Sequence, residues 1–81
     1  MPKLKVLSGK NLVNIFQQVD FEIAEQRGSH IKLRRFLNDG TKQILTIPNH
    51  DELDKGTIKA IYRQALRYIS ENELKRYFYS E

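Results

Sequence analysis

The chain has 81 residues, of which 14 are Lys or Arg and 10 are Asp or Glu, so its formal net charge is +4. Hydrophobic residues make up 40% and charged residues 30%, which suits one small soluble domain and excludes a membrane-embedded chain. The absence of cysteine excludes disulfide frameworks, cysteine-ligated zinc and thiol nucleophiles. No N-terminal apolar run has the length of a signal peptide, and we expect a cytoplasmic protein.

Three elements are predicted in the first half of the chain. Ser8 precedes apolar residues at helical spacing, which predicts an N-capped amphipathic helix from about Gly9 to Val19. Alternating polar and apolar residues then predict strands over 21–27 and 30–36, with Gly28-Ser29 between them.

The second of these strands has two different faces. The period of two places Ile31 and Leu33 on one face and His30, Lys32 and Arg34 on the other. The histidine therefore shares its face with two cations.

A third strand and two further helices are predicted in the second half. Asp39-Gly40 is a typical turn sequence, and residues 41–47 after it have the β-branched and apolar character of a strand that Pro48 ends. Apolar residues at helical spacing predict a helix that begins near Asp54. Residues 70–73 have the form of a capping box and open a short terminal helix.

The order of elements predicts the α+β class. Antiparallel strands flanked by helices give a two-layer α-β-β-β-α domain, in which both long helices cover one face of a three-stranded sheet. We expect one domain over residues 1–81, with 70–81 as a helical extension. The inner face of the sheet is expected to hold six apolar side chains: Phe21, Ile23, Ile31, Leu33, Leu45 and Ile47.

Positive charge is concentrated in one segment. Residues 26–38 contain no acidic residue and four cations, Arg27, Lys32, Arg34 and Arg35, so the segment holds as much charge as the whole chain. Such a patch attracts a polyanion through counterion release, and nucleic acid is the usual partner of a small basic domain. A solvated strand face explains the same charge equally well.

His30 is the strongest candidate for acid–base chemistry. It begins a strand directly after Gly28-Ser29 and lies among cations that would bind and orient a phosphate. An imidazole in that setting can remove the proton of a ribose 2′-hydroxyl, whose oxygen then attacks the adjacent phosphorus. A surface histidine without a chemical role is the alternative interpretation.

Three other features each have two interpretations. His50, in the turn after Pro48, could donate a proton to a leaving 5′-oxygen or only form a loop contact. Lys55 could hold a phosphate together with the N–H groups that begin the second helix, or simply open that helix. Five C-terminal aromatic residues could stack on bases or belong to the core: Tyr62, Tyr68, Tyr77, Phe78 and Tyr79.

No metal-site pattern and no nucleotide-binding loop occurs, so we expect neither a metal nor another cofactor.

Taken together, these residues resemble the HicA family of toxin–antitoxin mRNA interferases, also called YcfA-like proteins. The resemblance rests on Ser8-Gly9-Lys10 at the start of the first helix, on Arg27-Gly28-Ser29-His30 and on Asp39-Gly40. It continues through Ile47-Pro48-x-His50 and Lys55-Gly56-Thr57-Ile58.

The resemblance implies a double-stranded-RNA-binding-domain-like fold and a toxin that cleaves RNA without a metal and arrests translation and growth. The family's essential histidine falls on His30, and His50 is a candidate second acid or base. The residues that would bind RNA or shape its pocket are Arg27, Gly28, Ser29, Lys32, Arg34 and Lys55. A HicB antitoxin would neutralise the toxin by covering this surface, and DNA would be reached only through the antitoxin complex.

Two other function classes are compatible with the same residues. A non-catalytic double-stranded-RNA-binding module would bind RNA by shape, with steep salt dependence, no products and little dependence on His30. A structural interaction protein would use Gly28 and Gly40 for backbone geometry only and would show no RNA affinity.

Overall fold

Each of the three helices begins after a side chain whose oxygen accepts a backbone N–H. Ser8 Oγ accepts from the Asn11 N–H at 3.0 Å, and the Asn11 side chain accepts from the Ser8 N–H in return, which completes a capping box. Asp54 and Ser70 cap the second and third helices through their own side-chain oxygens. These caps fix where the helices start.

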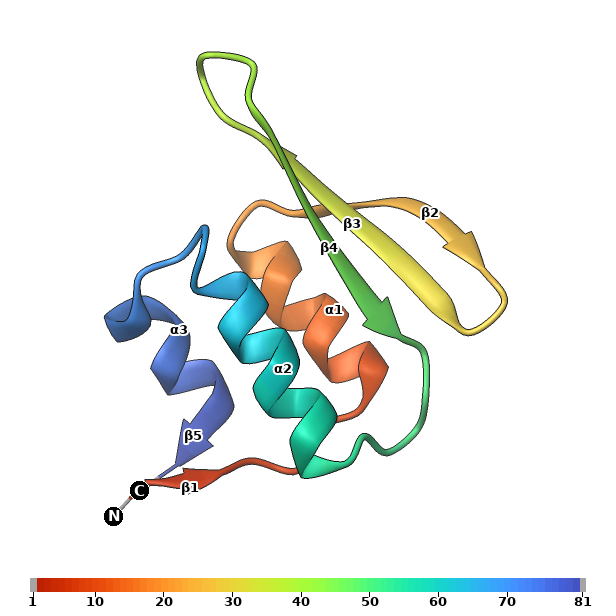
Figure 1. Ribbon diagram of the computed structural model, residues 1–81, viewed down its shortest axis with the longest axis vertical. Coiled ribbons are helices and arrows are strands. Elements are labelled where there is room, and N and C mark those ends of the chain that lie inside the picture. Colours follow the sequence, from red (N-terminus) through yellow and green to blue (C-terminus); the bar gives the residue numbers. More distant parts are fainter. Residues whose placement is uncertain (1, 81) are drawn as a thin grey trace.

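The computed structural model describes residues 2–80 and shows the expected order of long elements (Figure 1). The helices are α1 (Gly9–Gln18), α2 (Lys55–Ala65) and α3 (Glu71–Phe78); the strands are β1 (Lys3–Leu4), β2 (Glu22–Arg27), β3 (His30–Phe36), β4 (Lys42–Pro48) and β5 (Tyr79–Ser80). The strands β2, β3 and β4 form a three-stranded antiparallel sheet in that order, which confirms the α+β prediction. In the described part of the chain, no helix is long and apolar enough to cross a membrane.

The helices cover one face of the sheet, as the alternation of side chains predicts (Figure 1). Ile31, Leu33, Leu45 and Ile47 are at most 5% exposed and belong to the hydrophobic core. Burial of a side chain of this size contributes roughly 1.5–3 kcal/mol relative to leaving it in water. The opposite face of the sheet, which carries His30, has no helix over it.

The C-terminal segment is built into the same core. Phe78 at the end of α3 is fully buried, and its ring centroid lies 6.1 Å from that of Phe16 and 5.1 Å from that of Tyr62. The strand β5 continues from α3 and pairs with β1, so the two ends of the described chain lie side by side (Figure 1). All five C-terminal aromatic residues pack in or against the core, which supports the core interpretation: Tyr62, Tyr68, Tyr77, Phe78 and Tyr79.

Three details differ from the sequence predictions. Ile23 is expected inside but is 48% exposed, because β2 is an edge strand with a register irregularity between Ile23 and Glu25. The strand β4 includes Pro48, whose Cα partner is His30; an edge strand tolerates the missing N–H. The ladder of β1 and β5 is only two residues long and leaves no periodic pattern in the sequence.

The N-terminus of α1 contacts the segment that follows β4. The Gly9 N–H donates to the carbonyl oxygen of His50 at 2.9 Å. A Cβ at position 9 would collide with the Pro48 carbonyl oxygen and lie 3.0 Å from the Cα of Asn49. Only glycine therefore allows α1 to approach this segment so closely.

Candidate functional site

A two-residue turn holds the start of β3 against the end of β2. Arg27 and His30 are Cα partners, with Gly28 and Ser29 between them. Gly28 has a φ of +54° and Ser29 has no positive φ, the pattern of a type II′ turn with glycine first. The Ser29 carbonyl oxygen accepts from the Asn49 N–H at 2.6 Å, which ties the turn to the end of β4. The turn thus fixes His30 at one corner of the sheet.

His30 lines a hollow of about 220 Å³ on the uncovered face of the sheet. The lining residues come from all three strands: Glu25, Arg27, His30, Lys32 and Thr46. The strand register explains the grouping, because Glu25, Lys32 and Thr46 are successive cross-strand neighbours and Arg27 and His30 form the next pair. The structure thus brings the predicted histidine together with two of the predicted cations.

Two ion pairs balance part of the positive charge on this face. Arg27 Nε lies 3.2 Å from Glu25 Oε1, and Arg34 Nε lies 2.9 Å from Glu22 Oε1. The Arg27 side chain remains 87% exposed, and ion pairs in water contribute little to stability. Arg27 can therefore exchange its carboxylate partner for a phosphate. Lys32 takes part in neither ion pair.

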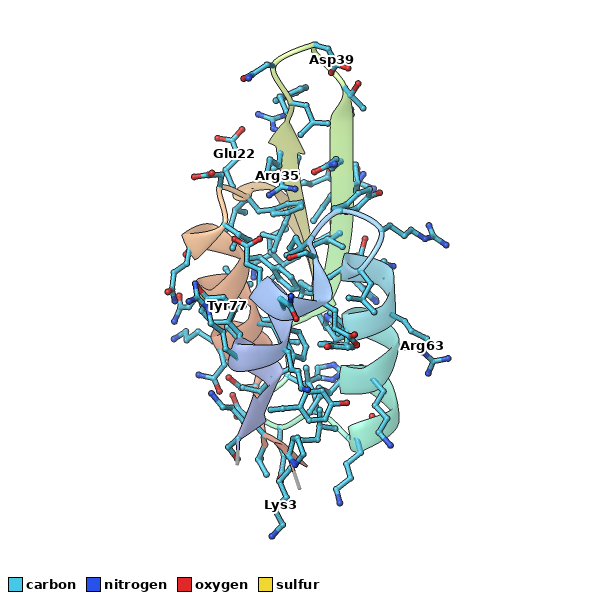
Figure 2. All side chains as sticks on the ribbon, turned by 90° about the vertical axis from the view of Figure 1, so that its left-hand side faces the viewer. Lys3, Glu22, Arg35, Asp39, Arg63 and Tyr77 are labelled. Carbon is cyan, nitrogen blue, oxygen red and sulfur yellow. The ribbon has the colours of Figure 1, made fainter. Side chains whose placement is uncertain are left out.

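Arg35 does not belong to the basic patch that the sequence predicts. Its side chain points to the helix side of the sheet, where Nη1 donates to the carbonyl oxygen of Val19 at 2.9 Å and Nη2 to that of Tyr68 at 3.1 Å (Figure 2). The prediction of Arg35 as a surface cation is wrong, because a count of charge along the chain ignores the alternation of a strand. The outer face of the sheet is consequently less basic than the segment.

Five predicted site residues are not among those that line the hollow: Gly28, Ser29, Arg34, His50 and Lys55. His50 is exposed in the segment after β4 and is not among the lining residues. Lys55 begins α2, whose N-terminus lies apart from the β2–β3 turn in Figure 1. There the Thr57 hydroxyl and the Thr57 N–H donate to the Asp54 carboxylate, and these hydrogen bonds lower the pKa of Asp54 below its usual value. A carboxylate thus already occupies the helix N-terminus where the sequence predicts a phosphate.

The comparison with known families covers the elements that build this site. A family model described as "HicA toxin of bacterial toxin-antitoxin" matches residues 9–66. This range extends from the start of α1 to the residue after α2. The chain belongs to the HicA toxin family. As a HicA toxin it is one component of a toxin–antitoxin system, and its partner in that system is a cognate antitoxin. No curated protein matches the chain.

The hollow of this HicA toxin contains two residues that the sequence predictions do not include, Glu25 and Thr46. The position of Thr46 is readable from the sequence, because the inward Leu45 and Ile47 place it on the outer face. Glu25 follows the register irregularity in β2, where the period of two is interrupted. Its face therefore depends on how β2 pairs with β3.

Proposed function

We propose that this HicA toxin is a metal-independent endoribonuclease in which His30 performs the acid–base chemistry. The observation that most supports the proposal is the shared hollow, in which one imidazole and two cations, Arg27 and Lys32, line the same space. All three side chains are exposed on the face of the sheet that no helix covers. An RNA strand can therefore reach them without a change in the fold.

The proposed reaction needs a base and positive charge near one phosphorus atom. His30 removes the proton of a ribose 2′-hydroxyl, and the 2′-oxygen attacks the adjacent phosphorus. Lys32 and Arg27 stabilise the negative charge that grows on the phosphoryl oxygens. The bond from phosphorus to the 5′-oxygen breaks, that oxygen takes up a proton from water, and His30 returns the proton it removed to the solvent. The products are a 2′,3′-cyclic phosphate and a 5′-hydroxyl, and His50 has no step in this scheme.

The test is incubation of purified protein with labelled single-stranded RNA in excess EDTA, followed by analysis of the product ends. We expect the wild type to give 2′,3′-cyclic phosphate ends and His30→Ala to give no products. His50→Gln serves as the matched control and should cut at the wild-type rate. Circular dichroism of His30→Ala should equal that of the wild type, because the side chain is exposed.

Three outcomes would contradict the proposal. Cleavage by His30→Ala at the wild-type rate would remove the histidine from the reaction. Loss of cleavage in EDTA would show a metal requirement. RNA that both proteins bind and neither cuts would assign the chain to the non-catalytic double-stranded-RNA-binding modules.

The cognate antitoxin is, in this proposal, an acidic HicB protein that covers the hollow and the adjoining edge of the sheet. Beside the hollow, a groove of about 340 Å³ runs between α1 and β2, and the half-exposed Ile23 and the cation Lys10 are among its lining residues. An apolar contact beside a lysine suits a protein that carries carboxylates. Ile23→Lys should weaken the complex with the antitoxin while RNA cleavage by the free toxin stays unchanged; an unchanged complex would exclude this edge.

A further inference from the structure

A row of cations on the exposed side of α2 and the turn after it has no part in the proposed reaction. Lys55, Lys59, Arg63 and Arg67 recur every four residues, and no acidic residue lies between them. All four are exposed, and neither ion pair of the described chain involves them. Lys55, Lys59 and Arg63 are about 6 Å apart along the axis of α2, and Arg67 follows in the turn after the helix. Like charges at this spacing slightly destabilise a helix, so helix stability does not explain the row.

A hollow lies between two of these cations. A hollow of about 450 Å³ is lined by Ala60, Arg63, Gln64 and Arg67. Figure 2 shows Arg63 pointing away from the body of the molecule, on the side opposite Glu22. This surface is therefore separate from the outer end of β2, where Glu22 pairs with Arg34.

The chemistry of the row favours a phosphate backbone over a protein surface. The large apolar side chains that are exposed in the described chain all lie outside α2: Val6, Ile23, Phe36 and Leu37. The centres of protein interfaces are built on aromatic and apolar anchors and are depleted of lysine. A strand of phosphates needs only regularly spaced cations.

We propose that this cationic row, Lys55, Lys59, Arg63 and Arg67, binds the phosphate backbone of the RNA substrate away from the point of cleavage. The inference rests on the proposed ribonuclease function and adds a second contact surface to it. The edge strand β4 links the two surfaces, because its Thr46 lines the His30 hollow and α2 packs against the same strand. An RNA strand that passes over this edge contacts both.

The binding test uses His30→Ala protein, so that affinity is measured whether or not His30 cleaves RNA. Arg63→Gln with Arg67→Gln removes two charges from the row, and Lys3→Gln with Lys75→Gln removes two exposed charges elsewhere. The row variant should bind a long single-stranded RNA about tenfold more weakly than the control pair. The slope of log affinity against log salt should fall by about 1–2 units. Equal affinity and equal slope in the two variants would overturn the inference.

Cleavage of a tetranucleotide RNA separates this inference from the proposed function, because so short a strand cannot occupy both surfaces. With His30 present, the row variant should cut the tetranucleotide at the wild-type rate and the long RNA more slowly. If the row variant cuts both substrates more slowly by the same factor, the inference of a second RNA-binding surface is overturned and the ribonuclease proposal stands. Absence of cleavage in every protein, with binding that still depends on the row, would overturn the ribonuclease proposal alone. Loss of the antitoxin complex with unchanged RNA binding would assign the row to an acidic protein.

Discussion

Arg35 and Gln43 are Cα partners on β3 and β4, and Arg35 Nε donates to Gln43 Oε1 at 2.8 Å. The same guanidinium lies 4.7 Å from the centroid of the Phe21 ring and donates to the Val19 carbonyl oxygen at the end of α1. Gln43 is only 8% exposed, so it depends on this partner. A cation at the C-terminal end of a helix is also favoured by the helix dipole. One arginine therefore joins the sheet to α1.

Arg35→Ala should lower the free energy of unfolding by about 2–4 kcal/mol, because Gln43 and the carbonyl oxygens lose a charged donor inside the protein. Arg35→Lys should recover part of the loss. Arg34→Gln, the neighbouring change on the outer face, should stay within about 0.5 kcal/mol of the wild type. Urea unfolding measures all three, and an Arg35→Ala protein as stable as Arg34→Gln would show that the buried contacts contribute nothing.

The sequence predicts which side chains of β3 point into the core, because the apolar residues that alternate along the strand are also those that gain most from burial. His30 and Lys32 lie outside and Ile31 and Leu33 inside, as the period of two requires. The charge of the site is less predictable: Glu25 and Arg27 share a face because they lie two residues apart on β2, but both come beside Lys32 and His30 only through the register of β2 and β3. Pairing between strands is a tertiary property that spacing within one strand does not contain.

Some of the site residues are brought together by local structure and others only by tertiary packing. The Gly28 turn and its neighbours are local, so the sequence brings Arg27 and His30 together correctly. His50 lies two residues after Pro48, the cross-strand partner of His30, and Lys55 begins the next helix; where both lie depends on how α1 and the segment after β4 pack. That packing is set by the close approach at Gly9, which no periodic pattern records.

Gly28 and Gly40 provide a matched pair of turn variants. Their φ values are +54° and +87°, and in both places a Cβ would have no atom within 4 Å. Alanine at either position should therefore cost about 1 kcal/mol of stability through backbone strain. Only Gly28→Ala disturbs the turn before His30, so it should slow RNA cleavage by about tenfold or more, whereas Gly40→Ala should not. Equal rates in the two variants would mean that the turn does not position His30.

Glu25→Gln should strengthen RNA binding by about threefold to tenfold, because it removes the negative charge that pairs with Arg27 inside the hollow. The matched change Glu22→Gln removes the same charge outside the hollow and should have a smaller effect. Fluorescence titration in the His30→Ala protein measures both affinities. A large loss of cleavage in Glu25→Gln, in protein that retains His30, would instead give this carboxylate a part in the chemistry.

Phe78→Ala should destabilise the protein by about 3–5 kcal/mol, although this residue lies beyond the 9–66 range of the family match. The ring is fully buried against Phe16 and Tyr62, so its removal leaves a cavity in the main core. Phe78→Leu should cost less because it fills part of that volume. The readout is urea unfolding, and a Phe78→Ala protein of wild-type stability would make the C-terminal segment dispensable for the fold.

The cap of α2 predicts a pH dependence of stability. Hydrogen bonds from the Thr57 hydroxyl and N–H hold the pKa of Asp54 below its ordinary value of 3.8. As the pH falls below that value, the unfolded chain takes up this proton before the folded chain does, so the stabilisation present above 3.8 is lost as the pH passes through the folded pKa. Asp54→Asn keeps a capping oxygen but does not titrate, so its stability should fall less than that of the wild type between neutral pH and about pH 3. Urea unfolding across this range measures the difference, and parallel curves would show that the cap does not contribute through its charge.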